Sequence, residues 1–322
     1  MTLAPDDLGP TICIGEILVE IVATTEGDGF TETQPFLGPY PSGAPAIFID
    51  QCGRIGGQAA MIGSVGQDDF GVVNTRRLTR DGVDTRAVAI HPGLPTGTAF
   101  VRYRPDGDRD FVFNMWTSAA GQLRWTDAVD TVVRRAGHLH VMGTSLVRSE
   151  IWDLVARAAD LIKARGGSVS LDPNLRKELH GDGETGARFA QILSQSDLIL
   201  PSGAELEAAA GTDDRTAAID HLFSLGVGEV VCKAGADGAT VYTPEATFTA
   251  PAFDVAELDP TGAGDCFGGA YVTCRRLGMG IDEALTYATA AGARNVTFLG
   301  PMEGAATRDE LDSFIAATKR RA

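Results

Sequence analysis

The residues best suited to chemistry lie in the glycine-rich stretch LDPTGAGDCFGGAYV, residues 258–272. The apolar run in its second half predicts a helix. The glycines therefore lie at a helix N-terminus, where backbone N–H groups lack partners and the helix dipole is positive. Gly262, Ala263 and Gly264 carry no bulky side chain, so their backbone can approach an anion closely. The spacing predicts an anion-binding turn.

Asp265 is an unexpected neighbour for such a turn, because a carboxylate repels a phosphate. The conflict is resolved if the carboxylate accepts a hydroxyl proton while the N–H groups hold a phosphoryl group in transfer. An aspartate in the first turn of a helix can also do no more than stabilise that helix. The spacing alone leaves both interpretations open.

Two familiar nucleotide-binding motifs are missing from the sequence. There is no G-x-x-x-x-G-K-[ST] pattern, and the first predicted strand is followed by Gly15 alone rather than by G-x-G-x-x-G. The sequence therefore argues against a P-loop enzyme and against a dinucleotide-dependent oxidoreductase.

The composition excludes several classes of protein. The chain has 322 residues, of which 44% are hydrophobic, and a formal net charge of −16. These values are typical of a globular protein, and the negative charge disfavours nucleic-acid and anionic-membrane partners. Its five cysteines are scattered, as expected of reduced thiols. The N-terminal MTLAPDDLGP has no apolar signal core and no stretch is long enough to span a membrane, so we expect a cytoplasmic location.

Short apolar runs alternate with helical patterns along the chain. One strand is predicted for residues 11–22, and further buried strands end near Asp172, Ser202 and Gly235. This alternation predicts an α/β fold with a mostly parallel sheet between layers of helices. Ligands bind beyond the carboxyl ends of strands in such sheets, which is where these three residues fall.

Residues 96–114 interrupt this rhythm with two alternating strands around Pro-Asp-Gly, the pattern of a β-hairpin. Phe100, Arg102 and Arg104 are expected on one face of the hairpin. We therefore predict a single domain, residues 1–322, with a small β-rich lid formed by residues 16–45 and 96–118.

Five motifs in a fixed order resemble those of the ribokinase/PfkB family of carbohydrate kinases, which includes fructokinases, tagatose kinases and 2-keto-3-deoxygluconate kinases. The agreement of the five motifs favours the catalytic interpretation of Asp265. The motifs are PSGAPAIFI (41–49) with VGQDDFG (65–71), LDPNLR (171–176), PSGAELE (201–207), KAGADG (233–238) and DPTGAGDCF (259–267).

The resemblance implies an enzyme that transfers a phosphoryl group from Mg·ATP to a sugar hydroxyl. Asp265 would be the general base, and Gly262, Ala263 and Gly264 would form the anion hole. The residues implied at the nucleotide are Lys233, Gly235, Ala236, Gly238 and Ser202, with Asn295 near the adenine. Those implied at metal ions are Glu205, which would organise Mg²⁺ and its waters, and Asp259 and Thr261, whose carbonyls would form a site for a monovalent cation such as K⁺.

The residues that the resemblance places at the acceptor depart from the family pattern. Ile47 occupies a position that is usually Asn, Ser202 replaces the Asn of an Asn-x-x-Glu motif, and Glu20 replaces an Asp that contacts sugar hydroxyls. The expected acceptor residues are Glu20, Gly43, Arg104, Asp172, Asn174 and Arg176.

Met115 bears on the identity of the sugar. Kinases of 2-keto-3-deoxygluconate carry an arginine there, and an acceptor carboxylate without a guanidinium partner loses a charge-assisted contact. The sequence therefore favours a neutral ketohexose, fructose or tagatose, although Arg102 and Arg104 could substitute. The alternatives are a 2-keto-3-deoxygluconate kinase, a nucleoside kinase that stacks its acceptor on Trp116 or Phe100, and a sugar-sensing protein without catalysis. An exposed lid strand also predicts a homodimer through the lid.

Overall fold

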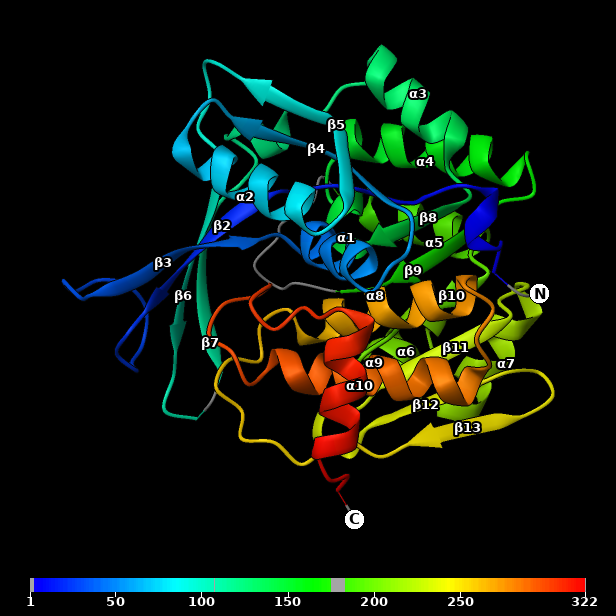
Figure 1. The fold of residues 1–322 in the computed structure, drawn as a ribbon. Helices are drawn as coiled ribbons and strands as arrows, with labels where there is room; N and C mark the ends of the chain where they lie inside the picture. The colour runs from blue at the N-terminus through cyan, green and yellow to red at the C-terminus, as the bar shows by residue number, and fades with distance from the viewer. Residues whose placement is uncertain (1–2, 107, 175–182, 322) are drawn as a thin grey trace.

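The computed structural model describes residues 3–106, 108–174 and 183–321. The main sheet, sheet A, has the strand order β13-β12-β11-β10-β9-β8-β1-β4-β5 and is parallel except for β12, which is antiparallel to both neighbours (Figure 1). The α/β prediction is thus confirmed. The strands of sheet A are β1 (Thr11–Ile14), β4 (Ala59–Gly66), β5 (Val83–His91), β8 (His138–Met142), β9 (Ser168–Asp172), β10 (Leu198–Ile199), β11 (Glu229–Lys233), β12 (Ala239–Tyr242) and β13 (Thr247–Ala250).

Helices cover both faces of sheet A, and alternate residues of one strand enter two separate cores. Ile12 and Ile14 of β1 join one hydrophobic cluster, whereas Cys13 joins the other. The helices of the first cluster are α3 (Asp127–Arg135), α4 (Ser149–Lys163), α5 (Thr185–Leu193), α6 (Glu205–Ala210) and α7 (Arg215–Ser224). Those of the second are α1 (Ala44–Arg54), α2 (Asp69–Arg80), α8 (Ala263–Arg276), α9 (Ile281–Asn295) and α10 (Arg308–Ala317).

A second, smaller sheet, sheet B, extends from one end of the molecule, at the left of Figure 1. Its order is β3-β2-β6-β7, in which β2 and β6 are parallel and the other two pairs are antiparallel. Residues 96–114 form the hairpin that the sequence predicts, and the expected lid segments contain all four strands. These are β2 (Leu18–Ala23), β3 (Phe36–Ser42), β6 (Gly97–Tyr103) and β7 (Arg109–Asn114).

The single strand predicted for residues 11–22 is wrong. The structure divides it into β1 and β2, which belong to different sheets, with Gly15, Glu16 and Ile17 between them. A Cβ atom on Gly15 would lie 2.6 Å from Cγ of Pro45, so the chain leaves sheet A where only glycine fits. Both strands are almost wholly buried, and Gly15 with Glu16 is the short break in the apolar pattern that marks the division.

A buried ionic cluster ties α1 and α2 to the loop that follows α9. Nε of Arg77 lies 3.3 Å from Asp50 Oδ2 and 2.7 Å from Asp81 Oδ2, and another nitrogen of the guanidinium donates to the carbonyl of Met302. Burial, together with the nearby charge of Asp81, outweighs the attraction of Arg77 and raises the pKa of Asp50 to about 8. The cluster thereby fixes the loop at Met302, which lies next to the start of α8.

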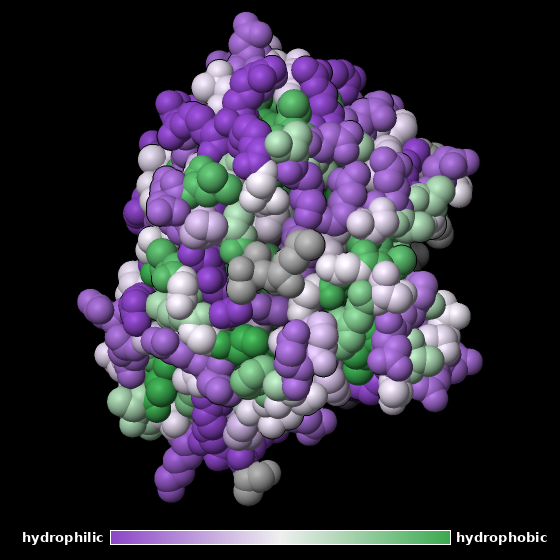
Figure 2. Space-filling model, turned by 90° about the vertical axis from the view of Figure 1, so that its right-hand side faces the viewer, coloured by the Kyte–Doolittle hydropathy of each residue, from purple (hydrophilic) through white to green (hydrophobic). Residues whose placement is uncertain are grey.

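The surface is polar where Figure 2 shows it, with hydrophobic residues in small, separate groups among hydrophilic ones. This is the ordinary surface of a globular protein. None of the helices in the described part of the chain has the length and apolar character of a membrane span.

Asp50 makes folding stability depend on pH. Its folded pKa of about 8 exceeds the unfolded value of about 3.9, so between these pH values the folded state keeps a proton that the unfolded state releases. We therefore expect the free energy of unfolding of the wild type to fall relative to that of Asp50→Asn as the pH rises from about 4 to about 8, as measured by urea denaturation. Asp69→Asn, which removes an exposed carboxylate of α2, is the control and should run parallel to the wild type.

Candidate active site

The turn at the start of α8 has a backbone that only glycine adopts without strain. Gly262 is the N-cap residue and has φ of +80°, and a Cβ atom there would lie 2.3 Å from the carbonyl oxygen of Pro301. The helix begins at Ala263, so the N–H groups of its first turn face outward at the positive end of the dipole. Asp265, in the same turn, is 8% exposed.

Two cavities meet at this turn. A large one, about 620 Å³, is lined by Ala263 and Gly264, and we call it the nucleotide cavity because the KAGADG motif also lines it. A narrow one, about 50 Å³, is lined by Thr261 and Asp265, and we call it the acceptor cavity. Residues of one helix turn therefore line both cavities, although the N–H of Ala263 also donates to the carbonyl of Pro260 at 3.4 Å.

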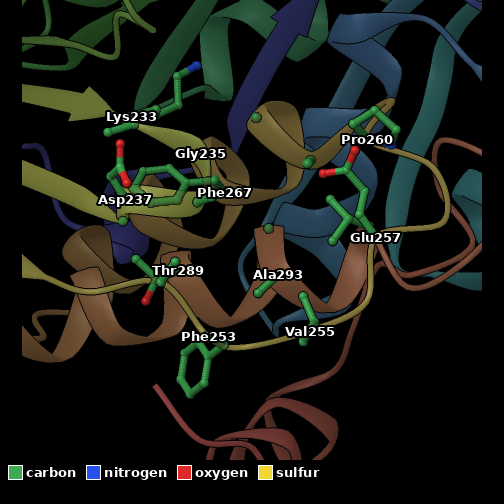
Figure 3. Close-up of a pocket in the computed structure, with 18 of the residues that line it drawn as sticks. Lys233, Gly235, Asp237, Phe253, Val255, Glu257, Pro260, Phe267, Thr289 and Ala293 are labelled. Atoms are coloured by element: carbon green, nitrogen blue, oxygen red, sulfur yellow. The ribbon is translucent and has the colours of Figure 1, made fainter. Parts of the chain in front are cut away.

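The nucleotide cavity runs from the end of β11 to the face of α9. Figure 3 shows Lys233 at one end and Phe253 at the other, with Thr289 and Ala293 of α9 between them along one side. Ser202, Gly235, Ala236 and Gly238 of the predicted set line it as well. The apolar wall of this cavity could not be recognised in the sequence. Small residues at helical spacing give the same pattern whether they face a hydrophobic core or a ligand. That wall includes Phe253, Val255, Thr289, Gly292, Ala293 and Val296.

Lys233 links the ends of two strands at this cavity. Its Nζ lies 2.5 Å from Oδ2 of Asp172 at the end of β9, and both side chains are almost fully buried. Asn174 donates its backbone N–H to the other Asp172 oxygen, at 3.2 Å, and has φ of +36°. The backbone N–H of Ser202 donates to Glu205 at 2.8 Å, so this carboxylate lies at the edge of the same cavity.

The acceptor cavity is built where sheet B meets sheet A. Glu20 of β2 and Gly43 at the start of α1 line it, as predicted. Glu16 also lines it and accepts a hydrogen bond from Thr144 Oγ1 at 2.9 Å, although the sequence analysis did not select it. The missed signal is its position just beyond the carboxyl end of β1. Sheet B supplies an apolar wall of Leu18, Ala99, Phe111 and Phe113, which continues at Met115, directly after β7.

Seven of the predicted residues that the structure describes line neither cavity: Gly262, Asp172, Asn174, Glu205, Asp259, Asn295 and Arg104. Asn295 is fully buried on another face of α9 from Thr289 and Ala293, and its Nδ2 donates to the carbonyl of Thr261 at 2.9 Å. Arg104 pairs with Asp110 at the end of the hairpin, because a nearby carboxylate satisfies its guanidinium. Arg176 lies outside the described residues.

The side chain of Asp259 stabilises the turn through hydrogen bonds. Its carboxylate is fully buried and accepts the N–H of Thr261 and that of Gly300, each at 2.9 Å. The described residues contain no group of three or more His, Cys, Asp or Glu side chains placed to hold a metal ion. The roles of Glu205, Asp259 and Thr261 at cations thus stay predictions.

Comparison with known proteins shows the family of this chain. The family model of the pfkB family carbohydrate kinases matches residues 11–308. The chain belongs to this family. Fructokinase-1 of Oryza sativa subsp. japonica is 30% identical to it, over 93% of this chain and 95% of the rice protein. The pfkB kinase is therefore an enzyme, an ATP-dependent sugar kinase.

Solved structures agree with the fold of this pfkB kinase. A candidate ribokinase II from E. coli, in complex with ATP and Mg²⁺, is 42% identical with a TM-score of 0.89, over 96% of this chain and 99% of that chain. Fructokinase from Vibrio cholerae O395, in a form with fructose, ADP and calcium bound, is 27% identical with a TM-score of 0.81, over 96% of this chain and 100% of that chain. The fold is ribokinase-like, as expected.

Replacing Gly262 tests the turn. At this positive φ, an alanine costs about 1–3 kcal/mol of backbone strain. Its Cβ atom would also overlap the carbonyl oxygen of Pro301, which adds to that cost. We expect Gly262→Ala to lower the melting temperature and to weaken ADP binding measured by calorimetry. Gly280→Ala is the matched control, because Gly280 is the N-cap residue of α9 with φ of −63° and open space around it. Equal behaviour of the two variants would contradict the assigned role of the turn.

Proposed function

We propose that this kinase transfers the γ-phosphoryl group of ATP to a hydroxyl group of a neutral ketohexose, fructose or tagatose, with Asp265 as the general base. The observation that carries the proposal is that Asp265 lines the acceptor cavity while Ala263 and Gly264, in the same first turn of α8, line the nucleotide cavity. The fructokinases among its relatives, one of them with fructose and ADP bound, support the choice of acceptor.

In the proposed reaction, a sugar hydroxyl in the acceptor cavity donates its proton to the carboxylate of Asp265. The hydroxyl oxygen then forms a bond to the γ-phosphorus of ATP while the bond from that phosphorus to the β–γ bridging oxygen breaks and ADP leaves. The N–H groups of Gly262, Ala263 and Gly264 stabilise the negative charge of the phosphoryl group in transfer. Lys233, at the same end of the nucleotide cavity, adds a positive charge and is itself held by Asp172. Positioning and charge stabilisation therefore account for the catalysis.

The residues present fit the metal ions that the family uses. Mg²⁺ is commonly held by one or two carboxylates together with phosphate oxygens and water, so the lack of a larger carboxylate cluster among the described residues suits it. Glu205 would hold it through water, and the ion would neutralise charge on the phosphates. The carbonyls of Asp259 and Thr261 would serve a monovalent cation, because a carbonyl oxygen that accepts from Asn295 keeps a second lone pair.

The acceptor cavity favours a neutral sugar over a sugar acid. Glu16, Glu20 and Asp265 supply three carboxylates, and no lysine or arginine is found among the described residues that line it. Met115, only 3% exposed, lies on its wall where an arginine would face an acidic substrate. Negative charge of this density repels a substrate carboxylate.

The cavity also disfavours a nucleoside acceptor. The space open to a ligand in this cavity is small, about 50 Å³, which suits an acceptor as large as a nucleoside less well than a hexose. Neither aromatic residue proposed to stack on a nucleobase lines it. Phe100 packs on the outer face of sheet B, 5.8 Å from Phe36 between ring centres, and Trp116 packs in the hydrophobic clusters.

The outer face of sheet B supports a homodimer formed through the lids. Phe30, Phe36 and Phe100 form a cluster of aromatic rings there. Phe36 on β3 is 38% exposed, and Val112, the partner of Phe100 on β7, is 45% exposed. Burying these side chains against a second copy would remove apolar surface from water and cover the exposed strands.

Asp265→Asn tests the general base. The amide cannot accept the hydroxyl proton, so we expect turnover with ATP and fructose to fall at least about 10²-fold, with ADP affinity and melting temperature close to those of the wild type. Asp282→Asn removes an exposed aspartate from the first turn of α9 and controls for the effect of a helix-end charge. Near-normal turnover by Asp265→Asn would show that the aspartate only stabilises its helix.

Substitution of Met115 tests the choice of acceptor. We expect the wild type to phosphorylate fructose or tagatose in preference to 2-keto-3-deoxygluconate and nucleosides, measured as kcat/KM from ADP release. Met115→Arg places a guanidinium in the cavity wall and should shift this ratio towards the sugar acid, whereas Met115→Leu should not. A wild type that prefers 2-keto-3-deoxygluconate would overturn the acceptor argument.

A further inference from the structure

The end of the β6–β7 hairpin contacts the turn that forms the anion hole. Tyr103 is the last residue of β6 and Arg109 the first of β7, and the two are direct partners across the strands. Both side chains reach out of sheet B to the segment Asp259–Thr261, more than 150 residues later in the chain.

The contact of Tyr103 is made to the carboxylate that organises the turn. Its hydroxyl donates to Asp259 Oδ1 at 2.5 Å, and that same oxygen accepts the backbone N–H of Thr261. Burial, together with the charge of Asp259, raises the pKa of Tyr103, so the hydroxyl keeps the proton that it donates. A charge-assisted bond of this kind is stronger than one between neutral groups.

Arg109 connects the turn with the wall of the acceptor cavity. Its Nη1 donates to Thr261 Oγ1 at 3.0 Å, and its guanidinium carbon lies 5.6 Å from the ring centre of Phe111. Thr261 immediately precedes Gly262, where the anion hole begins, and Phe111 lines the acceptor cavity. A shift of Phe111 would therefore move the side chain of Arg109, which is hydrogen-bonded to the turn.

We propose that Tyr103 and Arg109 are positioning residues that couple acceptor binding beneath sheet B to the alignment of the anion hole at Gly262–Gly264. The inference rests on the proposed function, because it takes the two cavities as acceptor and nucleotide sites. An acceptor that packs against Phe111 and Phe113 fixes the strand that carries Arg109. Coupling between binding sites is reciprocal, so acceptor and nucleotide each strengthen the binding of the other.

The coupling has a consequence for reaction with water. The anion hole is best aligned when an acceptor holds the hairpin against the turn. ATP bound without an acceptor is then poorly placed for transfer to water. Neither Tyr103 nor Arg109 needs to touch the reacting atoms for this effect, because each acts through Asp259 or Thr261.

Tyr103→Phe tests the inference with the loss of one hydroxyl group. In the protein without ligands, we expect faster hydrogen exchange at the amides of residues 261–264, measured by mass spectrometry. With ligands, the wild type should bind a non-hydrolysable ATP analogue more tightly when fructose is present. Tyr103→Phe and Arg109→Ala should lose most of this difference, and kcat should fall about tenfold with a smaller change in the KM for fructose.

Arg104→Ala is the matched control. Arg104 follows Tyr103 directly but pairs with Asp110 of the hairpin itself, so its loss should change neither hydrogen exchange at the turn nor the coupling. Unchanged exchange in Tyr103→Phe overturns the inference whatever the acceptor is. A wild type that phosphorylates no sugar contradicts the proposed function instead, and the exchange result still decides the role of Tyr103.

Discussion

The buried carboxylate of Asp259 is the interaction on which the geometry of the site depends. It accepts hydrogen bonds from Thr261 within its own turn, from Gly300 in the loop after α9 and from Tyr103 in sheet B. These donors come from three parts of the fold and meet at one side chain just before the anion hole. A buried charge is stable only when its hydrogen bonds are made, so the three parts constrain one another.

The nucleotide cavity and the acceptor cavity are built from different parts of the fold. The nucleotide half is built on strands and helices of the central core, where Lys233 and Asp172 join two strand ends and Arg77 anchors Met302 next to the turn. The acceptor half takes its apolar wall from sheet B, which extends from that core. Under the proposed function, phosphoryl transfer is supported by the core, whereas the acceptor meets both the core, through Glu16 and Asp265, and sheet B.

The sequence predicted the family and the fold class better than the geometry of the site. The glycines and Asp265 were recognisable because a helix start with a tight backbone requires those residue types, and the alternation of strands and helices gave the correct layers. The division of residues 11–22 is marked in the sequence only by Gly15 and Glu16, a break short enough to pass for part of one buried strand. A buried amide on α9 serves equally well as a ligand or as a support, so the place of Asn295 near the adenine stays a prediction, and the packing shows only that its amide meets the carbonyl of Thr261.

Only three residues connect β1 with β2 and so join the two sheets. One of these residues, Glu16, lines the acceptor cavity. A connection this short cannot absorb insertions without displacing a group that faces the sugar. Over evolution, new acceptor preferences in this architecture are therefore more accessible through substitutions on the strands of sheet B than through changes in the length of the linker. The same constraint makes grafting of β6 and β7 from a relative a practical route to redesigning the acceptor.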